Sequence, residues 1–416
     1  YTLPMQTTST PKIVVIGGGF AGIQTVKALL KYHPKAAITL VSKSLIFEYY
    51  PALYKLVTGA LPIEVSVPIK TIFPKDVELL EATYTGIDQA RQVVLLEGGK
   101  ELPYDYAVIA LGSETNYFGI PGLPERSYSF KSVSEALRLK QHFCKLFGSA
   151  ATLPKDEQVA KLRTIIVGAG PSGVELAGDL RHYLTRLALD AKIDPNLIAI
   201  DLIDGGSRVL PVMSERISNI AESRLRKMGI NIYVNRALQA EEIDKIILKD
   251  MEVKTGTVIW TAGTRINGGF NTIPNVALTE RKRVQVTDYL TLPNDNRVFV
   301  AGDGAGTQYS GLAQTAIYDG NYIGKHIANL IKGKKIAAYK PTQPSFVIPI
   351  GTGWALFSSG NFVMTGLIPW FMRSAIDFKY FVSIVPLSYV FKVFQLGKKY
   401  RKVKGGCSID NLAKTI

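Results

Sequence analysis

The chain has 416 residues, 47% of them hydrophobic and 20% charged, and this length and composition exclude a disordered or low-complexity protein. The two cysteines and four histidines are scattered, so we expect neither a disulfide framework nor a metal site. Of the net charge of +15, +11 lies in residues 331–416, which leaves no case for a nucleic-acid surface spread over the molecule. Residues 1–12 hold no apolar segment, so we expect no secretory signal.

The first predicted elements are a buried strand, a glycine turn and a helix, in residues 12–31. The same order returns in residues 164–189, and each turn has the spacing GxGxxG. In such a turn the first glycine permits the bend, the second lets the backbone approach a pyrophosphate, and the third lets helix pack on strand. The free amides and positive dipole end of the helix stabilise the phosphates. The glycines are Gly17, Gly19 and Gly22 in the first turn and Gly168, Gly170 and Gly173 in the second.

A second repeated feature indicates that the two segments are domains of related design. Apolar strands end at Gly112 and at Gly263, each 95 residues after the first glycine of its turn. A later apolar strand ends at Gly302, is followed by Asp303, and precedes a helix that begins near Leu312. Such a strand completes the first domain if the second is inserted in it. We therefore predict an α/β fold with two Rossmann-like dinucleotide-binding domains, the second inserted in the first.

The residue that ends the second strand of such a domain contacts the adenosine ribose. In the second domain this residue is Asp204, whose carboxylate would repel a 2′-phosphate, so we expect NADH to be preferred over NADPH. In the first domain the corresponding residue is Ser42, followed by Lys43. A hydroxyl still bonds a ribose, though less strongly than a carboxylate.

Two dinucleotide sites in one chain indicate two different dinucleotides. We expect tightly bound FAD and transiently bound NADH, with a hydride passing from nicotinamide to flavin, a reaction that needs positioning more than side-chain chemistry. The helix N-terminus at Leu312, Ala313 and Gln314 is a candidate for tuning the flavin, because a positive dipole end stabilises the anionic reduced form.

These motifs resemble those of the type II NADH:quinone oxidoreductases, which are single-subunit, non-pumping members of the two-dinucleotide-binding flavoprotein superfamily. The resemblance covers nearly the whole chain, and its specific parts are residues 17–22, 50–59, 104–113, 168–180, 258–263, 300–303 and 313–316. It implies that Asp303 holds the flavin ribityl chain, that Glu175 lies beside the nicotinamide, and that Gln314 borders the quinone pocket.

The sequence departs from this family at two places on the quinone side. Tyr318 stands where a second glutamine is common, and residues 350–354 lack the basic residues that often occur there. These departures leave the identity of the electron acceptor open. The expected catalytic residues are Glu175, Gln314 and Tyr318, and the expected cofactor-binding residues are Gly17, Gly19, Phe20, Gly22, Ser42, Lys43, Gly112, Gly168, Gly170, Gly173, Glu175, Asp204, Gly263, Gly302, Asp303, Ala313 and Gln314.

The last part of the chain has the composition of a membrane anchor. After a predicted hairpin, with strands in 346–357 and 362–365, residues 367–396 are rich in large apolar side chains and are divided by Pro386 into two short helices. Arg373 and Asp377 are spaced i,i+4 on the first helix, and five basic residues lie in 398–404. Such a segment is typical of interfacial binding, and no clean transmembrane span is present.

We therefore expect a peripheral membrane protein that serves a lipophilic quinone, on the cytoplasmic face of the cell membrane or on an organellar inner membrane. The apolar helices would otherwise dock a homodimer partner or another protein. The expected domains are residues 8–125 with 268–335 for FAD, 126–267 for NADH, and 336–416 for the membrane.

Three other functions stay open. A sulfide:quinone oxidoreductase needs paired redox cysteines, and the positions of Cys144, in a helical stretch, and Cys407, in the basic tail, argue against such a pair. A non-catalytic sensor would bind NADH and flavin without sustained turnover. The third alternative is an enzyme that reduces a specialised quinone precursor or a protein acceptor.

Overall fold

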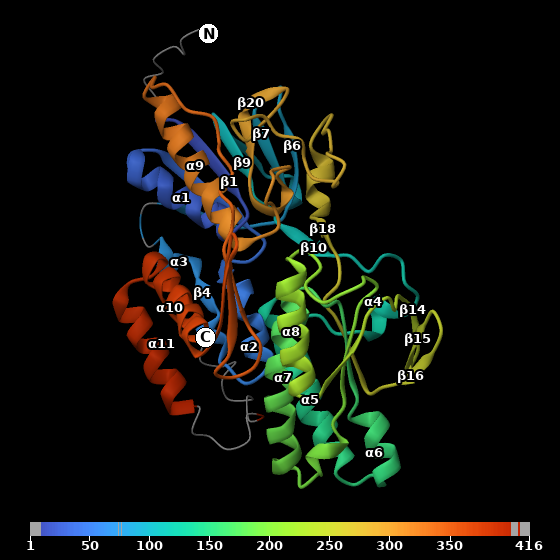
Figure 1. Ribbon diagram of the computed structural model, residues 1–416. Helices are drawn as coiled ribbons and strands as arrows, with labels where there is room; N and C mark the ends of the chain where they lie inside the picture. The colour runs from blue at the N-terminus through green and yellow to red at the C-terminus, as the bar shows by residue number, and fades with distance from the viewer. Residues whose placement is uncertain (1–9, 74, 76, 401–406, 408–416) are drawn as a thin grey trace. The chain divides into compact units, whose positions relative to one another are not determined.

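The computed structural model describes residues 10–73, 75, 77–400 and 407 (Figure 1). The chain forms two compact units, each assembled from separate segments. Unit 1 comprises the described residues of the ranges 1–48, 67–114 and 264–344. Unit 2 comprises the described residues of the ranges 49–66, 115–263 and 345–416. The short segment from Tyr49 and the C-terminal part therefore pack with the second glycine motif, whereas the assignment of each cofactor to a domain stays a prediction.

A mainly parallel sheet forms the core of unit 1. Its strands lie in the order β19-β20-β9-β1-β2-β5, and only the edge strand β19 runs antiparallel. The central strand is apolar and buried from Ile13 to Ile16, as expected for a parallel strand covered on both faces. The strands are β1 Lys12–Ile16, β2 Ala37–Ser42, β5 Glu78–Glu81, β9 Tyr106–Ile109, β19 Thr291–Leu292 and β20 Asp295–Val300.

Two helices of unit 1, α1 (Phe20–Tyr32) and α9 (Ala313–Ile331), lie side by side (Figure 1). Gly320 and Gly324 make this close approach possible, because a Cβ on either would lie within 2.5 Å of atoms of α1. The smaller elements of unit 1 are β3 Ile46–Glu48, β4 Ser66–Pro68, α3 Ile69–Ile72, β6 Tyr84–Asp88, β7 Val93–Leu96, β8 Glu101–Pro103, β10 Ser113–Thr115, β18 Thr264–Ile266 and the 3₁₀ turn η6 Gly302–Gly304.

Unit 2 repeats the same design on a smaller scale. Its parallel sheet has the order β13-β12-β11-β17, with the glycine turn between β11 and α7. The elements are α2 Leu53–Val57, η2 Pro62–Glu64, α4 Leu123–Arg126, α5 Val133–Ala150, α6 Lys155–Lys161, β11 Thr164–Val167, α7 Pro171–Asp190, β12 Ile200–Ile203, α8 Glu215–Lys227, β13 Ile230–Tyr233, β14 Leu238–Glu241, β15 Lys245–Leu248, β16 Glu252–Lys254 and β17 Thr257–Trp260. The α/β class with Rossmann-like sheets is thus confirmed.

The C-terminal part of unit 2 differs from the predicted hairpin. It forms an antiparallel sheet of β21 (Phe346–Pro349), β22 (Ala355–Ser359) and β23 (Phe362–Gly366). The prediction of one long first strand was wrong because Gly351 and Gly353 adopt φ values of +77° and +73°, which turn the chain back. The two helices that follow, α10 (Leu367–Ile384) and α11 (Leu387–Tyr400), are separated at Pro386 as predicted.

The described residues contain no helix that is both long enough and apolar enough to cross a bilayer. The basic residues 401, 402 and 404 of the predicted anchor lie outside the described residues.

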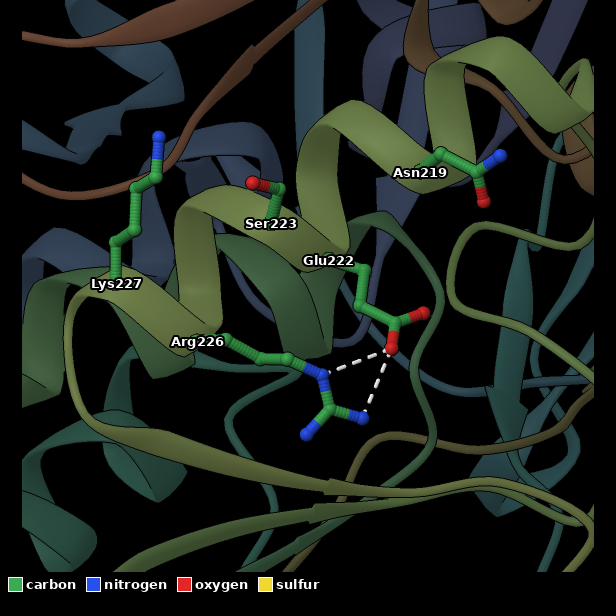
Figure 2. A pocket seen from close by; sticks show the side chains of 5 residues that line it. All are labelled: Asn219, Glu222, Ser223, Arg226 and Lys227. Carbon is green, nitrogen blue, oxygen red and sulfur yellow. Dashed lines mark hydrogen bonds and ion pairs between the residues drawn. The ribbon is translucent and has the colours of Figure 1, made fainter.

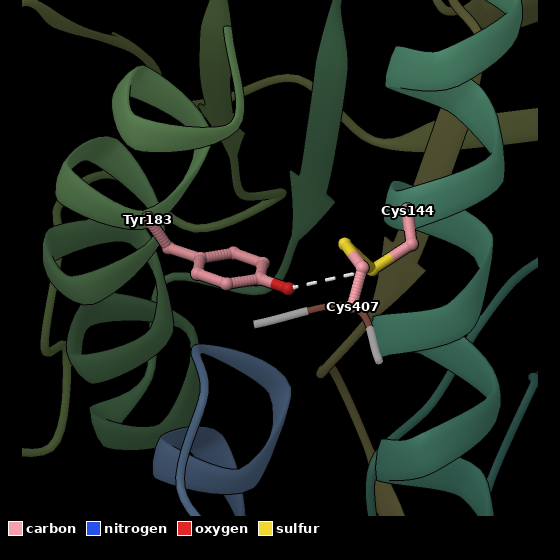
Figure 3. Close-up of a disulfide and its surroundings, with 3 residues drawn as sticks. All are labelled: Cys144, Tyr183 and Cys407. Carbon is pink, nitrogen blue, oxygen red and sulfur yellow. Dashed lines mark hydrogen bonds between the residues drawn. A yellow bond between two sulfur atoms is a disulfide. The ribbon is translucent and has the colours of Figure 1, made fainter. Parts of the chain in front are cut away.

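The two cysteines are paired, contrary to expectation. Cys144, on α5, forms a disulfide with Cys407, 263 residues further along the chain (Figure 3). The prediction was wrong because the positions of Cys144 in a helical stretch and of Cys407 in the basic tail were taken as evidence against a pair, whereas both residues belong to unit 2.

Candidate functional site

The first glycine turn, in unit 1, combines two crowded glycines with an open one. Gly17 has a φ of +112°, and a Cβ there would lie 2.2 Å from the carbonyl oxygen of Ala110. A Cβ on Gly22 would lie 1.8 Å from the carbonyl oxygen of Gly17. A Cβ on Gly19, in contrast, would meet no atom within 4 Å. The fold therefore requires the first and third glycines, while the second borders open space where a pyrophosphate can approach the backbone.

The second turn, in unit 2, has the same geometry. Gly168 also has a φ of +112°, and its Cβ would lie 2.6 Å from the amide nitrogen of Ala262. A Cβ on Gly173 would lie 1.9 Å from the carbonyl oxygen of Gly168, and one on Gly170 would meet nothing within 4 Å. Both turns are thus shaped as cradles for a phosphate-containing ligand.

The predicted ribose-binding residues contact the middle of each turn. The amide of Gly18 donates to Ser42 Oγ at 3.3 Å. At the equivalent place in unit 2, the amide of Ala169 donates to Asp204 Oδ2 at 2.6 Å, and the amide of Gly206 donates to Asp204 Oδ1 at 2.6 Å. Because a carboxylate has about four acceptor positions, Asp204 retains capacity for a ribose hydroxyl.

The helices that follow the turns begin without caps. Gly19 and Gly170 are the N-cap residues of α1 and α7, neither start has a side-chain cap, and no acidic residue lies in either first turn. Pro171 occupies the first turn of α7, where its missing N–H costs nothing. The remaining first-turn amides and the positive dipole end favour an anion at both places.

Asp303 is held firmly in unit 1 at the carboxyl end of β20. Ser113 Oγ donates to Asp303 Oδ2 at 2.5 Å, and Arg283 Nη1 donates to the Asp303 carbonyl oxygen. The amide of Gly302 donates at 2.9 Å to Asp319 Oδ2, which is fully buried. Burial raises the pKa of Asp319 to about 6. These bonds fix the loop and leave Asp303 Oδ1 as an acceptor for a ligand hydroxyl.

The other predicted residues of α9 meet at its N-terminus. Gln314 Nε2 donates to Tyr318 OH at 3.0 Å, one helical turn away, and both side chains are half-buried. The helix starts after Leu312 without a side-chain cap or a first-turn acid, as the tuning hypothesis requires. Ala313 is the first residue of the helix.

Four further predicted residues have less direct roles. The ring of Phe20 is buried against Phe47, with centroids 5.1 Å apart, so it belongs to the core and offers a ligand only its backbone. Lys43 is exposed beyond β2. Gly112 has a φ of +70° and open space at its Cβ position, whereas a Cβ on Gly263 would lie 2.4 Å from the ring of Phe118.

Glu175 belongs to a buried ion network in unit 2 that the sequence did not predict. Arg373 of α10 donates from Nη1 to Glu175 Oε1 at 3.0 Å and from Nε to Asp377 Oδ1 at 3.0 Å. Asp377 also accepts from Lys55 Nζ and from Tyr49 OH, each at 2.8 Å. Arg373 additionally donates to the carbonyl oxygens of Val347 and Pro51. Helix α10 is therefore bound through charged and polar side chains to α7 and to the segment that begins at Tyr49.

The acids in and next to this network have pKa values shifted in different directions. Burial raises the pKa of Glu175 to about 7, although Arg373 and Lys55 act in the opposite direction. Burial likewise raises the pKa of Asp179, one turn further along α7, to about 6. Burial also acts to raise the pKa of Asp377, but its ion pairs with Arg373 and Lys55 hold it below its usual range. Of these three acids, Glu175 therefore has the pKa that burial raises highest, and Asp377 has the lowest.

On α10 the charged side chains are buried and large apolar side chains are exposed. Arg373 and Asp377 are each only 9% exposed, whereas Phe371 and Ile368 are 58% and 65% exposed. The spacing of Arg373 and Asp377 showed that they share a face, and the structure shows that this face is the buried one. The exposed apolar side chains of the helix are Leu367, Ile368, Phe371, Ile376 and Phe378.

An open hollow of about 610 Å³ lies on α8 and is lined by Asn219, Glu222, Ser223, Arg226 and Lys227 (Figure 2). Its lining is polar, and Arg226 Nε donates to Glu222 Oε1 at 2.9 Å within it. None of the predicted site residues lines it, so it adds nothing to the candidate site.

Sequence reasoning missed several residues of the site. Lys55 lies inside the motif of residues 50–59, but the motif does not reveal that Lys55 pairs with Asp377. Arg283 and Asp319 carry no recognisable spacing to Asp303, and only the fold brings them together.

The family model of the pyridine nucleotide-disulphide oxidoreductases matches residues 11–320 of this chain. The chain belongs to this family. The match spans both glycine turns, Asp303 and the start of α9, and so includes residues of both units.

Similar curated proteins confirm the narrower resemblance drawn from the motifs. The type II NADH:quinone oxidoreductase Ndh of Mycobacterium tuberculosis is 29% identical over 393 residues, which cover 89% of this chain and 84% of that protein. A type II NADH:quinone oxidoreductase of Staphylococcus aureus is 28% identical over 413 residues, covering 94% of this chain and 98% of that protein.

Solved structures share the fold of this pyridine nucleotide-disulphide oxidoreductase. NDH2 from Plasmodium falciparum, in complex with NADH, matches with a TM-score of 0.84 at 17% identity, over 95% of this chain and 99% of that one. The sulfide:quinone oxidoreductase of Aquifex aeolicus matches with a TM-score of 0.75 at 22% identity, over 90% of this chain and 91% of that one.

Proposed function

We propose that the protein is a type II NADH:quinone oxidoreductase. It would transfer a hydride from NADH to tightly bound FAD, and then two electrons to a lipophilic quinone, without pumping protons. The observation that carries the proposal is the pair of matching glycine turns, each with an open second glycine and an uncapped helix start. The similarity to proteins named type II NADH:quinone oxidoreductase supports the same function.

FAD fits the residues of unit 1. The first turn would offer backbone amides to the pyrophosphate, Ser42 a hydroxyl to the ribose, and Asp303, fixed by Ser113, a carboxylate to the ribityl hydroxyls. Bound there, FAD would supply the hydride acceptor and the electron donor of the reaction. The N-terminus of α9, which has no side-chain cap and no acidic residue in its first turn, would favour negative charge on a cofactor bound there. Gln314 and Tyr318 orient each other beside that terminus and are the residues we propose for acceptor contact.

NADH fits unit 2 for a reason of charge. Asp204 is already aligned by two backbone amides, so it can accept from the ribose hydroxyls without reorganising. The same carboxylate repels the 2′-phosphate of NADPH, which supports a preference for NADH. Glu175 lies on α7, the helix that begins at this turn, consistent with a place beside the nicotinamide.

The exposed face of α10 supports a peripheral membrane location. Burying five large apolar side chains is worth on the order of 10 kcal/mol at roughly 1.5 to 3 kcal/mol each. Attraction of the neighbouring basic residues to anionic lipid gives about 1 kcal/mol each and is weakened by salt. The apolar contribution therefore dominates, and we propose attachment to the face of the membrane where cytoplasmic NADH is available. A homodimer that covers the same face is the competing arrangement.

Anaerobic mixing tests the proposed function directly. NADH should bleach the flavin absorbance, and a lipophilic quinone added afterwards should restore it. A protein that stays colourless after reconstitution with FAD, or that keeps its oxidised spectrum with NADH, would refute the proposal. Sulfide, added in place of NADH, should leave the spectrum unchanged, whereas bleaching by sulfide would favour the sulfide:quinone reaction. A sensor would be bleached by NADH but would show no sustained turnover with any quinone.

The two open glycines provide a matched pair of variants. Gly170→Val should abolish NADH binding while FAD stays bound, and Gly19→Val should abolish FAD binding, because each valine fills the space left for a pyrophosphate. Titration of NADH and measurement of the flavin content separate the two losses. Loss of FAD in the Gly170→Val protein would mean that the two sites are assigned wrongly.

A further inference from the structure

The disulfide joins α5 to a point beyond α11, so it ties the end of the chain to unit 2 (Figure 3). We propose that Cys144–Cys407 is a thiol-exchange site for a dithiol reductant, and that opening it frees α11 from unit 2. This inference does not depend on the hydride chemistry proposed above.

The surroundings of the two sulfurs make them unequal. Cys407 is exposed, whereas Cys144 is half-buried on α5 with its Sγ 3.8 Å from the hydroxyl of Tyr183 (Figure 3). Lys140 lies one helical turn before Cys144 and is 2% exposed. The guanidinium of Arg186 lies 5.5 Å from the ring centre of Tyr183. A donor hydroxyl and two cations therefore favour a thiolate at Cys144, which makes it the better leaving group.

The exchange balances with one dithiol. A thiolate of the reductant attacks the accessible Sγ of Cys407, a mixed disulfide forms, and the electron pair of the broken bond goes to Sγ of Cys144. The second thiolate of the reductant then attacks its own sulfur in the mixed disulfide and releases Cys407. Two electrons pass to the protein, two thiols form, and the reductant becomes an internal disulfide.

The two C-terminal helices depend on this bond to different degrees. α10 is held by the buried contacts of Arg373 with Glu175 and Asp377. α11 has weaker attachment, since Tyr389 OH lies 3.5 Å from the carbonyl oxygen of Ser66, and Leu387 and Phe391 are mostly exposed. Seven peptide steps separate the end of α11 from Cys407, whose Cα lies 5.7 Å from that of Cys144, so the intact disulfide keeps that end within about 30 Å of Cys144 on α5. Opening the bond removes this limit from α11 while α10 stays in place.

Hydrogen exchange of the full-length, FAD-loaded protein tests the release. In protein opened with dithiothreitol, amides of α11 should exchange about tenfold faster than in the oxidised protein, while those of α10 change by less than about twofold. Cys407→Ser should show the fast α11 exchange with or without dithiothreitol. Equal exchange of α11 in both forms would overturn the proposal, as would two maleimide-reactive thiols in protein prepared without reductant.

The rate of opening tests the role of the cationic surroundings. Lys140→Met should slow opening by dithiothreitol about threefold, because the departing thiolate loses a neighbouring charge. Lys140→Arg should restore the rate, and Lys145→Met removes the same charge from an exposed position of α5 as the control. Equal slowing by Lys145→Met, or a wild-type rate for Lys140→Met, would contradict the exchange mechanism.

Discussion

Replacing Arg373 by methionine removes the cation shared by Glu175 and Asp377 while keeping an unbranched side chain of similar length. The substitution also removes donors from the carbonyl oxygens of Val347 and Pro51. Breaking a buried ion pair by removing one partner typically costs about 3–5 kcal/mol, because it leaves an uncompensated charge out of water. We expect a loss of folding stability of this size, starting with the detachment of α10.

The loss of folding stability in Arg373→Met should increase as pH rises. Burial raises the pKa of Glu175 to about 7 from its ordinary value of 4.5, so the stabilising contribution of Glu175 is complete below pH 4.5 and is lost as pH rises through 7. The difference of 2.5 pKa units corresponds to about 3 kcal/mol. Arg373 lowers the pKa of Glu175, so without the arginine this penalty grows. The Arg373→Met protein should therefore lose about 3 kcal/mol of folding stability at pH 5 and about 5 kcal/mol at pH 8.

Denaturant unfolding at the two pH values measures this difference. Lys379→Met is the matched control, because it removes the same charge from an exposed position of the same helix, and it should cost less than about 0.5 kcal/mol. Adding Glu175→Gln to Arg373→Met should remove the part of the loss that grows with pH, so the double variant should lose about 3 kcal/mol at both pH values, because Asp377 still lacks its arginine. A loss below about 1 kcal/mol, or one that shrinks as pH rises, would show that the network does not hold α10 as argued.

The other predictions concern the ligands, the membrane and the disulfide. Asp204→Ala should weaken NADH binding about tenfold and narrow its advantage over NADPH, since charge-assisted bonds to the ribose are lost; unchanged selectivity would remove Asp204 from the site. Phe371→Asp should release the protein from liposomes in buffer of ordinary salt, whereas the wild type should stay bound in concentrated salt and leave only with mild detergent. Gln314→Leu should raise the KM for quinone while the rate of flavin bleaching by NADH stays unchanged. Cys407→Ser should lower the free energy of unfolding by about 3–5 kcal/mol, because the disulfide closes a very long loop, and calorimetry against the oxidised wild type measures this.

Local sequence patterns predicted the parts of the fold that depend on local geometry. The glycine spacings identified both turns because first and third glycines at those places are sterically required, as Gly17 and Gly22 show. The start of α9 and the break at Pro386 followed from equally local features. The division of the C-terminal strand at Gly351 was missed, because a glycine in a strand pattern does not reveal the sign of its φ.

Long-range contacts could not be predicted in the same way. The i,i+4 spacing of Arg373 and Asp377 defines a face of a helix but not its surroundings, and in this apolar segment the polar face is the buried one. The pairing of Cys144 with Cys407 spans 263 residues and depends on how unit 2 folds. Lys55 and Glu175 were visible as motif residues, yet only the fold showed that Arg373 and Asp377 connect them.

The shared arginine gives α10 a mechanical property. A pull on this helix from a lipid surface would be resisted first at Arg373, whose guanidinium cannot leave without uncovering Glu175 and Asp377 together. A force applied to the exposed apolar face of α10 is thereby transmitted to the carboxylate of Glu175 on α7, the helix that begins at the second glycine turn. A membrane contact through α10 and the proposed NADH site on α7 would therefore be connected through Arg373.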